Sequence, residues 1–448
     1  MSATTPAAER GQPRCNDRHS LLPKRLGTVA GAITACVLAA PAFSQESSAP
    51  TLTVVKPASK VCQLIGDLDR EFMAPTLNQT FSRYGLGGTD LGASFEHAGK
   101  VWFLFGDSVP ASGNPTCGDS VATSTATDAS KCIPLTFLTQ SDGHYRSPAV
   151  PGIDLGCFDV PLHGVSNGAS MYVWFSTNCM SKSVLARSDD DGLSYTLINT
   201  LSDCGCGDAC VNGQPPTSCA NPSCHFVNVS AAIVPAASAG GLPGSGDRVV
   251  LFGSGAYRKS DVYLAVSSLA TIEDKATLRY FSGTDAATGA PIWKASEASA
   301  APLFATAGEN GKLSAPCVGE LSVHHSAPLG SWLALYNCGD RIDGRIAPTA
   351  WGPWSSGAVV FDPVADGGYC HFIYRANSGC DALSDPGRLA DSGGVYGSYV
   401  VPRFSAAMPD GGALIYFVMS TWNPYTAMLM ETVLGQESHR PRRHPKRT

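Results

Sequence analysis

Five short apolar segments recur at nearly even spacing along the chain, and this repetition restricts the fold more than any other feature. The segments are Val101 to Phe105, Met171 to Phe175, Val249 to Phe252, Trp332 to Tyr336 and Leu414 to Val418. With Trp102, Tyr172, Val250, Trp332 and Ile415 as markers, the gaps are 70, 78, 82 and 83 residues. A period of that length holds about four short strands with their turns, which is one blade of a β-propeller. The sequence therefore predicts an all-β chain folded as a five-bladed β-propeller.

Composition is consistent with one large folded domain. The 448 residues are 44% hydrophobic and 15% charged, so the chain can bury a sizeable core. We expect the propeller to cover residues 61–434, after a short linker at residues 43–60. A net charge of −6 provides no basic surface for nucleic acid. The exception is the basic segment at residues 435–448, which we expect to be a disordered tail.

The N-terminus has the layout of a secretory signal. Lys24 and Arg25 precede an apolar stretch from Leu26 to Ala40, and small residues follow up to Ala42. We therefore expect residues 1–42 to be a signal peptide and the protein to be secreted or periplasmic. A lipoprotein anchored through Cys36 is the alternative, because Ile33 to Cys36 resembles a lipidation box. No other stretch is apolar for the roughly 18 residues that a membrane span needs.

The cysteines fit an exported protein. Of the sixteen, Cys15 and Cys36 lie in the leader, which leaves fourteen in the mature chain, an even number suited to disulfides. The densest group is Cys204, Cys206, Cys210, Cys219 and Cys224. A zinc site is the alternative for this group, but its spacing is irregular for zinc ligands. We predict a disulfide-bonded loop, with no metal and no cofactor.

Hairpin register predicts which residues meet at the mouth of the central channel. A two-residue turn at Ala98-Gly99 would place Asp90 opposite Asp107, and a turn at Asn167-Gly168 would place Asp159 opposite Ser176. The same alignment starts the inner strands of the next blades at Asn228, at Glu320 and within Tyr396 to Tyr399. These residues are predicted to ring one end of the channel.

Paired carboxylates indicate acid–base chemistry. Facing aspartates repel each other, which raises one pKa and leaves one carboxyl as an acid beside an ionised base or nucleophile. Hydrolysis of a glycosidic bond needs such a pair, here Asp90 and Asp107, with Glu320 as a further catalytic candidate. The alternative is that the aspartates cap turns, and for Asp159 the two interpretations are evenly balanced.

Aromatic side chains supply the other half of a sugar site. Trp422 ends the fifth marker segment at the level where Asp107 ends the first, so we predict that Trp422 and Asn423 bind substrate. Asp159, Asn228 and Tyr396 complete the predicted substrate-binding set. Ordinary core packing is the alternative for Trp351 and Trp354.

Several segments resemble glycoside hydrolase family 183, which includes microbial endo-D-arabinanases. They include GTDLGASFEHAGKVWFLFGDS at 88–108, FVNVS at 226–230, GELSV at 319–323 and STWNPYTAMLM at 420–430. The resemblance implies a five-bladed propeller with catalytic carboxylates at Asp90 and Asp107. Two departures are the aspartate at Asp159, where family members often have glutamate, and the cysteine-rich insertion from Cys204 to Cys224.

The leading hypothesis is a secreted glycoside hydrolase that cleaves furanosidic linkages. The resemblance suggests endo-action on the D-arabinan of mycobacterial-type arabinogalactan or lipoarabinomannan. The alternatives are a non-catalytic glycan-binding propeller, a hydrolase of a different glycan, or an interaction scaffold. The expected partner is a polysaccharide, and we expect the protein to be a monomer.

Overall fold

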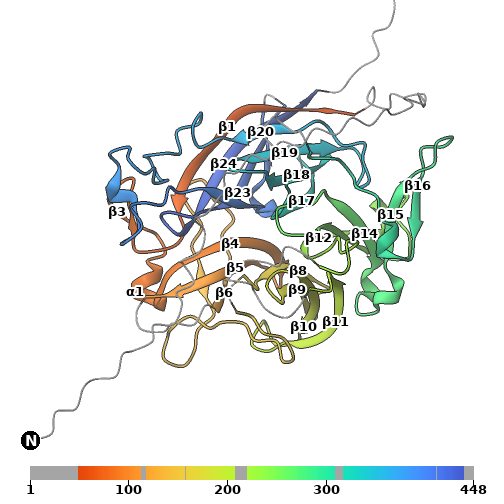
Figure 1. Cartoon of the computed structure of the whole chain (residues 1–448), viewed down its shortest axis with the longest axis horizontal. Helices are drawn as coiled ribbons and strands as arrows, with labels where there is room; N and C mark the ends of the chain where they lie inside the picture. The colour runs from red at the N-terminus through yellow and green to blue at the C-terminus, as the bar shows by residue number, and fades with distance from the viewer. Residues whose placement is uncertain are drawn as a thin grey trace, which may run out of the picture.

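The computed structural model describes residues 49–111, 118–156, 158–206, 219–307, 316–409 and 411–437. The predicted signal peptide, Cys36, Cys210 and residues 438–448 lie outside this part of the chain. Five sheets of four or five strands surround a central axis, as Figure 1 shows. The predicted five-bladed β-propeller is therefore confirmed.

The first three blades follow one another along the chain. Blade 1 contains β4 (Leu86–His97), β5 (Lys100–Pro110), β6 (Gly118–Ser124) and β7 (Thr136–Phe137). Blade 2 contains β8 (Pro161–Ser166), β9 (Met171–Thr177), β10 (Lys182–Ser188) and β11 (Thr196–Asp203). Blade 3 contains β12 (Asn228–Val234), β13 (Arg248–Ser254), β14 (Tyr263–Ser268), β15 (Arg279–Thr284) and β16 (Pro291–Lys294).

Blades 4 and 5 complete the ring. Blade 4 contains β17 (Leu321–Ser326), β18 (Ser331–Asn337), β19 (Ile342–Ala347) and β20 (Ala358–Phe361). Blade 5 contains β21 (Val395–Val400), β23 (Ala413–Thr421), β24 (Thr426–Glu437) and β1 (Thr51–Gln63), with β22 (Ala406–Ala407) beside β23. Outside the blades lie β2 (Leu68–Asp69), β3 (Ala74–Pro75) and the helix α1 (Thr80–Tyr84). Each predicted marker segment provides the second strand of its blade.

The N-terminal strand closes the ring. β1 pairs antiparallel with β24, from Thr51 opposite Glu437 to Gln63 opposite Met428. The predicted linker at residues 43–60 is therefore wrong from Thr51 onward, because these residues supply the outer strand that blade 5 would otherwise lack. The predicted tail likewise begins too early, since β24 continues to Glu437.

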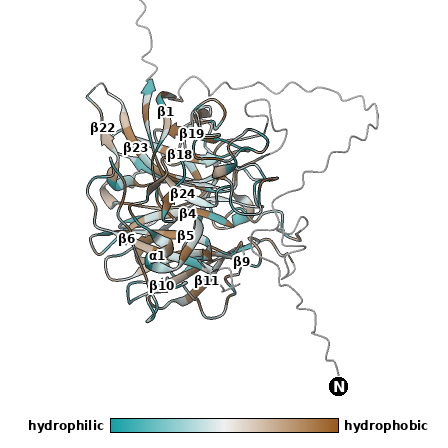
Figure 2. Ribbon diagram, turned by 90° about the vertical axis from the view of Figure 1, so that its left-hand side faces the viewer, coloured by the Kyte–Doolittle hydropathy of each residue, from teal (hydrophilic) through white to brown (hydrophobic). Residues whose placement is uncertain are grey.

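Hydrophobic side chains fill the spaces between neighbouring blades. Trp102 and Phe175 belong to the cluster between blades 1 and 2, and similar clusters lie at the other junctions. Figure 2 shows brown hydrophobic segments within the strands of the ring. The inner strands β4, β8, β12, β17 and β21 contact one another in turn, so residues at their first ends meet around the axis.

The predicted register in blade 1 is correct at the turn and wrong at the site. His97 lies opposite Lys100 as expected, but the register shifts between Leu91 and Ala93, so Asp90 pairs with Gly106 rather than Asp107. The cause is a bulge at Gly92, whose φ is +106°. A Cβ atom there would lie 2.8 Å from Val418 Cγ1, so only glycine allows this close approach.

The register in blade 2 is also displaced. Ser166 pairs with Met171, so four residues rather than two form the turn. The backbone N–H of Ser176 donates to the carbonyl of Val160, not to Asp159. The prediction that Asp159 faces Ser176 is therefore wrong by one residue.

Disulfides hold several of the connections together. The bridges Cys204–Cys224 and Cys206–Cys219 confirm the predicted bonded loop and exclude zinc ligation by these four thiols. Three others join Cys62 to Cys132, Cys317 to Cys338 and Cys370 to Cys380. Within the described ranges, no helix is both long and apolar enough to cross a membrane.

Candidate active site

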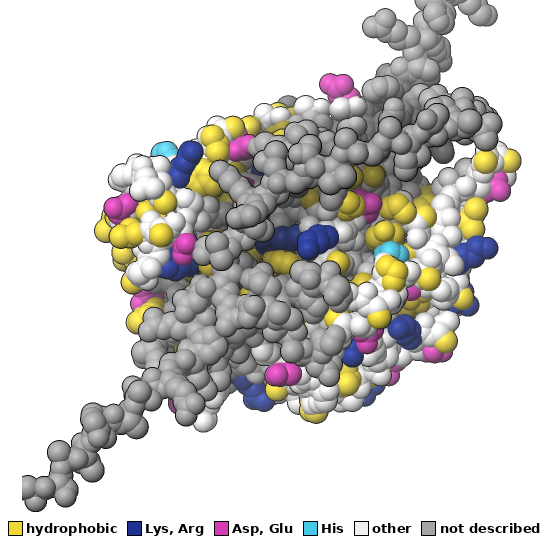
Figure 3. Space-filling view, in the orientation of Figure 1, with side chains coloured by type: hydrophobic (Ala, Val, Ile, Leu, Met, Phe, Trp, Pro, Cys, Tyr) yellow, Lys and Arg dark blue, Asp and Glu magenta, His cyan; other side chains and the backbone are white. Residues whose placement is uncertain are grey.

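A cavity of about 390 Å³ opens at the end of the axis where the inner strands begin. Figure 3 shows a hollow near the middle of the face seen in Figure 1, with basic side chains in it. Most of the predicted site residues line the cavity, namely Asp90, Asp107, Asn228, Glu320, Tyr396 and Trp422. These residues come from blades 1, 3, 4 and 5, and Val160, just before β8, adds blade 2 to the lining.

Asp90 is buried beside the axis in β4. Its Oδ2 accepts a hydrogen bond from the Tyr396 hydroxyl at 3.0 Å. Across the strand pair lies Gly106, where a Cβ atom would come within 2.9 Å of Asp90 Oδ1. Burial raises the pKa of Asp90 well above its usual range, the charge of Asp107 raises it further, and the Tyr396 hydrogen bond opposes the shift. At neutral pH, Asp90 can therefore hold a proton and act as an acid.

Asp107 is fixed by contacts to its backbone and its carboxylate. Its backbone has a left-handed φ of +38°, its N–H donates to Asp119 Oδ1 at 3.1 Å, and its Oδ1 accepts from the Phe158 N–H at 2.9 Å. Burial raises the pKa of Asp107 to about 6, the Phe158 hydrogen bond opposes this rise, and the charge of Asp159 adds to it. Asp107 can therefore be ionised near neutral pH while Asp90 keeps its proton.

Glu320 is held by three side chains just before β17. Its Oε1 accepts from the Tyr257 hydroxyl and pairs with the Arg258 guanidinium, both at 3.3 Å. Its Oε2 accepts from the Asn337 amide at 2.9 Å. These partners fix a third carboxylate in the lining of the cavity.

Trp422 provides an aromatic wall. The guanidinium of Arg388 stacks on its ring, with Cζ 3.8 Å from the ring centroid, and Tyr425 packs edge-on at 5.9 Å. The Tyr425 hydroxyl in turn donates to the Asp107 carbonyl at 3.0 Å. The aromatic wall and the carboxylate are thus connected through one side chain.

Two predicted substrate-binding residues do not line the cavity. Asp159 accepts hydrogen bonds from the backbone N–H groups of Cys179 and Met180, both at 3.0 Å, which is the capping arrangement considered as its alternative. Asn423 is fully buried, and its amide donates to the carbonyls of Arg388 and Asp391. Both side chains therefore support loops around the cavity.

Sequence reasoning missed Asp119, Tyr257 and Arg258. Asp119 is buried on β6, where burial and then the charge of Asp107 raise its pKa well above the usual range. A signal was present, because Gly118-Asp119-Ser120 repeats the Gly-Asp-Ser sequence that ends at Ser108, and the two serine hydroxyls meet at 2.8 Å. Within the described ranges, no cluster of His, Cys, Asp and Glu side chains could hold a metal ion.

Residues 76–431 match the family described as a domain of unknown function, DUF4185. The match extends from the segment before α1 to the middle of β24, so it includes every cavity residue named above. No curated protein matches the chain.

Solved structures similar to this chain include glycoside hydrolases at low identity. The exo-β-1,3-galactanase of Phanerochaete chrysosporium has a TM-score of 0.41 and 8% identity, covering 84% of this chain and 64% of its own. The GH43_1 enzyme of Xanthomonas citri has a TM-score of 0.40 and 9% identity, covering 87% and 92%. A β-xylosidase/α-arabinofuranosidase from a compost metagenome has a TM-score of 0.38 and 9% identity, covering 79% and 92%. The chain thus spans slightly less than two thirds of the length of the galactanase.

Proposed function

The chain belongs to the DUF4185 family, and we propose that it is a glycoside hydrolase whose acid and base are Asp90 and Asp107. The observation that carries this proposal is the carboxyl pair itself, a buried Asp90 and a half-buried Asp107. Each carboxyl lines the same cavity, and each has a raised pKa, well above the usual range for Asp90 and about 6 for Asp107. Two carboxyls whose environments separate their protonation states are what cleavage of a glycosidic bond requires.

The surroundings assign a role to each carboxyl. Asp90, protonated and oriented by Tyr396, would donate its proton to the departing glycosidic oxygen. Asp107, ionised and held by Phe158, would activate water or attack the anomeric carbon. Glu320, paired with Arg258, would stabilise the positive charge that develops on the sugar ring.

The proposed substrate is a furanoside polymer, with D-arabinan as the first choice. This choice rests on the resemblance to glycoside hydrolase family 183, carried by the segments around Asp90, Asp107, Glu320 and Trp422. We further propose that the protein acts outside the cytoplasm, because the five disulfides seen among the described residues are typical of an oxidising compartment.

The direct test is incubation of the purified protein with mycobacterial arabinogalactan, followed by analysis of the released sugars. We expect arabino-oligosaccharides of mixed length, as endo-cleavage produces. The Asp90→Asn and Asp107→Asn variants should each lower kcat by at least about 10²- to 10⁴-fold with little change in binding, since each removes one proton-transfer or nucleophilic function. Binding without cleavage by the wild-type protein would instead support a glycan-binding propeller, and near-normal hydrolysis by both variants would assign catalysis to other residues.

A further inference from the structure

A second groove of about 570 Å³ lies beside the cavity, at the junction of blades 1 and 5. One side is formed by residues 63–70 and by Phe81 of α1, and the other by the loop at residues 385–388 and by residues 424–426. Gly87, Gly88 and Val109, close to the catalytic aspartates in sequence, form its inner end.

A thin wall of side chains separates this groove from the cavity. Arg388 lines the groove and stacks on Trp422, which lines the cavity. Tyr425 lines the groove, while its hydroxyl donates to the Asp107 carbonyl. A Cβ atom on Gly88 would lie 2.8 Å from the Tyr425 carbonyl oxygen, so β4 is pressed directly against this wall. The two spaces therefore lie on either side of one shared wall.

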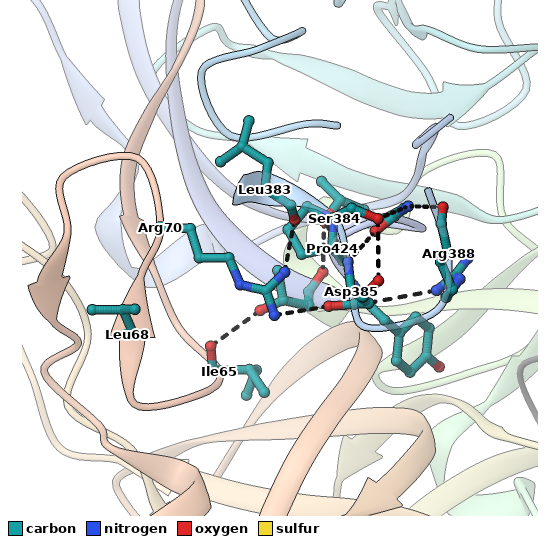
Figure 4. A network of polar contacts seen from close by, with 12 residues as sticks. Ile65, Leu68, Arg70, Leu383, Ser384, Asp385, Arg388 and Pro424 are labelled. Atoms are coloured by element: carbon teal, nitrogen blue, oxygen red, sulfur yellow. Dashed lines mark hydrogen bonds and ion pairs between the residues drawn. The ribbon is translucent and has the colours of Figure 1, made fainter. Parts of the chain in front are cut away.

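The polar side of the groove is rigidly held, as Figure 4 shows. Arg70 donates to the Leu383 carbonyl at 2.7 Å and pairs with Asp385 at 2.9 Å. Asp385 accepts from the Tyr425 N–H at 2.7 Å. Arg388 is 8% exposed, and its Nε and Nη2 have no hydrogen-bond partner among the described residues. The groove thus has fixed polar groups on its wall, and the Arg388 guanidinium is held within that wall by Asp385 and by the Trp422 carbonyl.

The side formed by residues 63–70 and Phe81 also presents exposed apolar side chains to the groove. Leu68 is 43% exposed and Phe81 is 48% exposed. A preformed site in which apolar side chains face a few fixed polar groups suits a ligand with apolar faces and hydroxyl edges. Sugar rings have this character, because their C–H faces pack on apolar side chains while their hydroxyls form hydrogen bonds.

We propose that the second groove binds the continuation of the polysaccharide chain whose bond is cleaved in the cavity. This inference rests on the proposed function, because it makes the groove a distal subsite of the same enzyme. A polymer lying over the wall would contact Trp422 on one side and Phe81 on the other. The protein should therefore prefer long chains to short ones.

Two variants test the groove without touching the carboxylates. Phe81→Ala removes the exposed aromatic side chain. Gly87→Phe fills the groove, and its backbone tolerates a side chain because the nearest atoms to a Cβ atom lie 3.4–3.5 Å away. Leu193→Ala is the matched control, since Leu193 is 49% exposed and does not line the groove.

The measurement compares arabinogalactan with the shortest arabino-oligosaccharide that the wild-type protein cleaves. For Phe81→Ala and Gly87→Phe, KM for the polymer should rise about tenfold, the loss expected for one stacking contact. The value for the shortest substrate should change less than about twofold, and Leu193→Ala should change neither. An unchanged KM for the polymer in both groove variants would overturn the proposal.

Binding separates failure of the groove from failure of the proposed function. Affinity electrophoresis in gels containing arabinogalactan measures retardation whether or not the polymer is cleaved. If the wild-type protein is retarded without cleavage and Phe81→Ala is not, the groove is supported and the proposed hydrolysis is contradicted. If the wild-type protein neither binds nor cleaves the polymer, both proposals are overturned.

Discussion

At the scale of single residues, the site concentrates carboxyls that are buried or half-buried, where water stabilises their charge less than in the unfolded chain. Asp90, Asp107 and Asp119 all have raised pKa values, and burial is the largest cause in each case. The ionised forms are therefore less favourable in the folded protein than in the unfolded chain. The fold tolerates this cost at the position where the proposed reaction needs one protonated and one ionised carboxyl.

The raised pKa of Asp107 predicts how the free energy of unfolding should change with pH. Its pKa is about 6 in the folded protein, against 3.8 for an ordinary aspartate, so the folded state binds the proton more tightly. Its contribution to stability is thus most favourable below about pH 4 and is lost as the pH rises from about 4 through 6. Asp107→Asn should raise the free energy of unfolding at pH 7 by up to about 3 kcal/mol, with a difference near zero below pH 4.

Chemical denaturation of wild type and Asp107→Asn across this pH range measures the difference. Asp340→Asn is a suitable control, because Asp340 lines the same cavity but is exposed. As a substitution of an exposed side chain, it should leave the free energy of unfolding at pH 7 within about 0.5 kcal/mol of wild type. A destabilised Asp107→Asn protein at pH 7 would mean that the carboxylate is a structural cap, since loss of a cap costs about 1 kcal/mol.

At the scale of strands and hairpins, the sequence predicts those features that depend on residues close together in the chain. The second strand of every blade and the His97–Lys100 hairpin were predictable from apolar segments and turn residues. The bulge at Gly92 was not, because the need for glycine arises from Val418, more than 300 residues away in the chain. One bulge moves Asp107 out of the position opposite Asp90, yet both side chains still reach the cavity.

Tyr257 and Arg258 were missed because their positions depend on contacts between blades. Arg258, from the loop after β13, meets Glu320 of the next blade at 3.3 Å. The position of the Arg258 side chain depends on Gly319, where a Cβ atom would lie 2.6 Å from Arg258 Cγ. Such a pair is invisible to strand periodicity, because its residues lie in connections whose path is set by tertiary packing.

A variant at Trp422, in the connection after β23, tests whether this side chain binds glycan. Trp422→Ala should weaken glycan binding about tenfold, because the variant removes the aromatic wall of the cavity. It also removes the stacking partner of Arg388, so a loss of stability of about 1–2 kcal/mol should accompany it. Affinity for the polymer, measured with the Asp90→Asn variant as background, checks the first effect. Unchanged affinity combined with lower stability would show that Trp422 only supports the fold.

At the scale of the whole molecule, the propeller depends on how its ring is closed. Blade 5 contains strands from both ends of the described chain, because β1 pairs with β24. The closing strand also carries Cys62, which is bonded to Cys132 of the segment between β6 and β7 in blade 1. β1 is therefore held to blade 5 by strand pairing and to blade 1 by a disulfide.

The Cys62–Cys132 disulfide should stabilise the fold more than Cys370–Cys380, because it spans 70 residues whereas Cys370–Cys380 spans 10. Chain entropy in the unfolded state makes the longer loop worth more, by roughly 1–2 kcal/mol. The Cys62→Ala/Cys132→Ala variant should lose about 2–4 kcal/mol in chemical denaturation, and Cys370→Ala/Cys380→Ala should lose less. Activity at low temperature should persist in the first variant, since neither cysteine lines the cavity. An equal or larger loss in the second variant would contradict the dependence on loop length, and no loss in the first would show that β1 is held by the β1–β24 pairing alone.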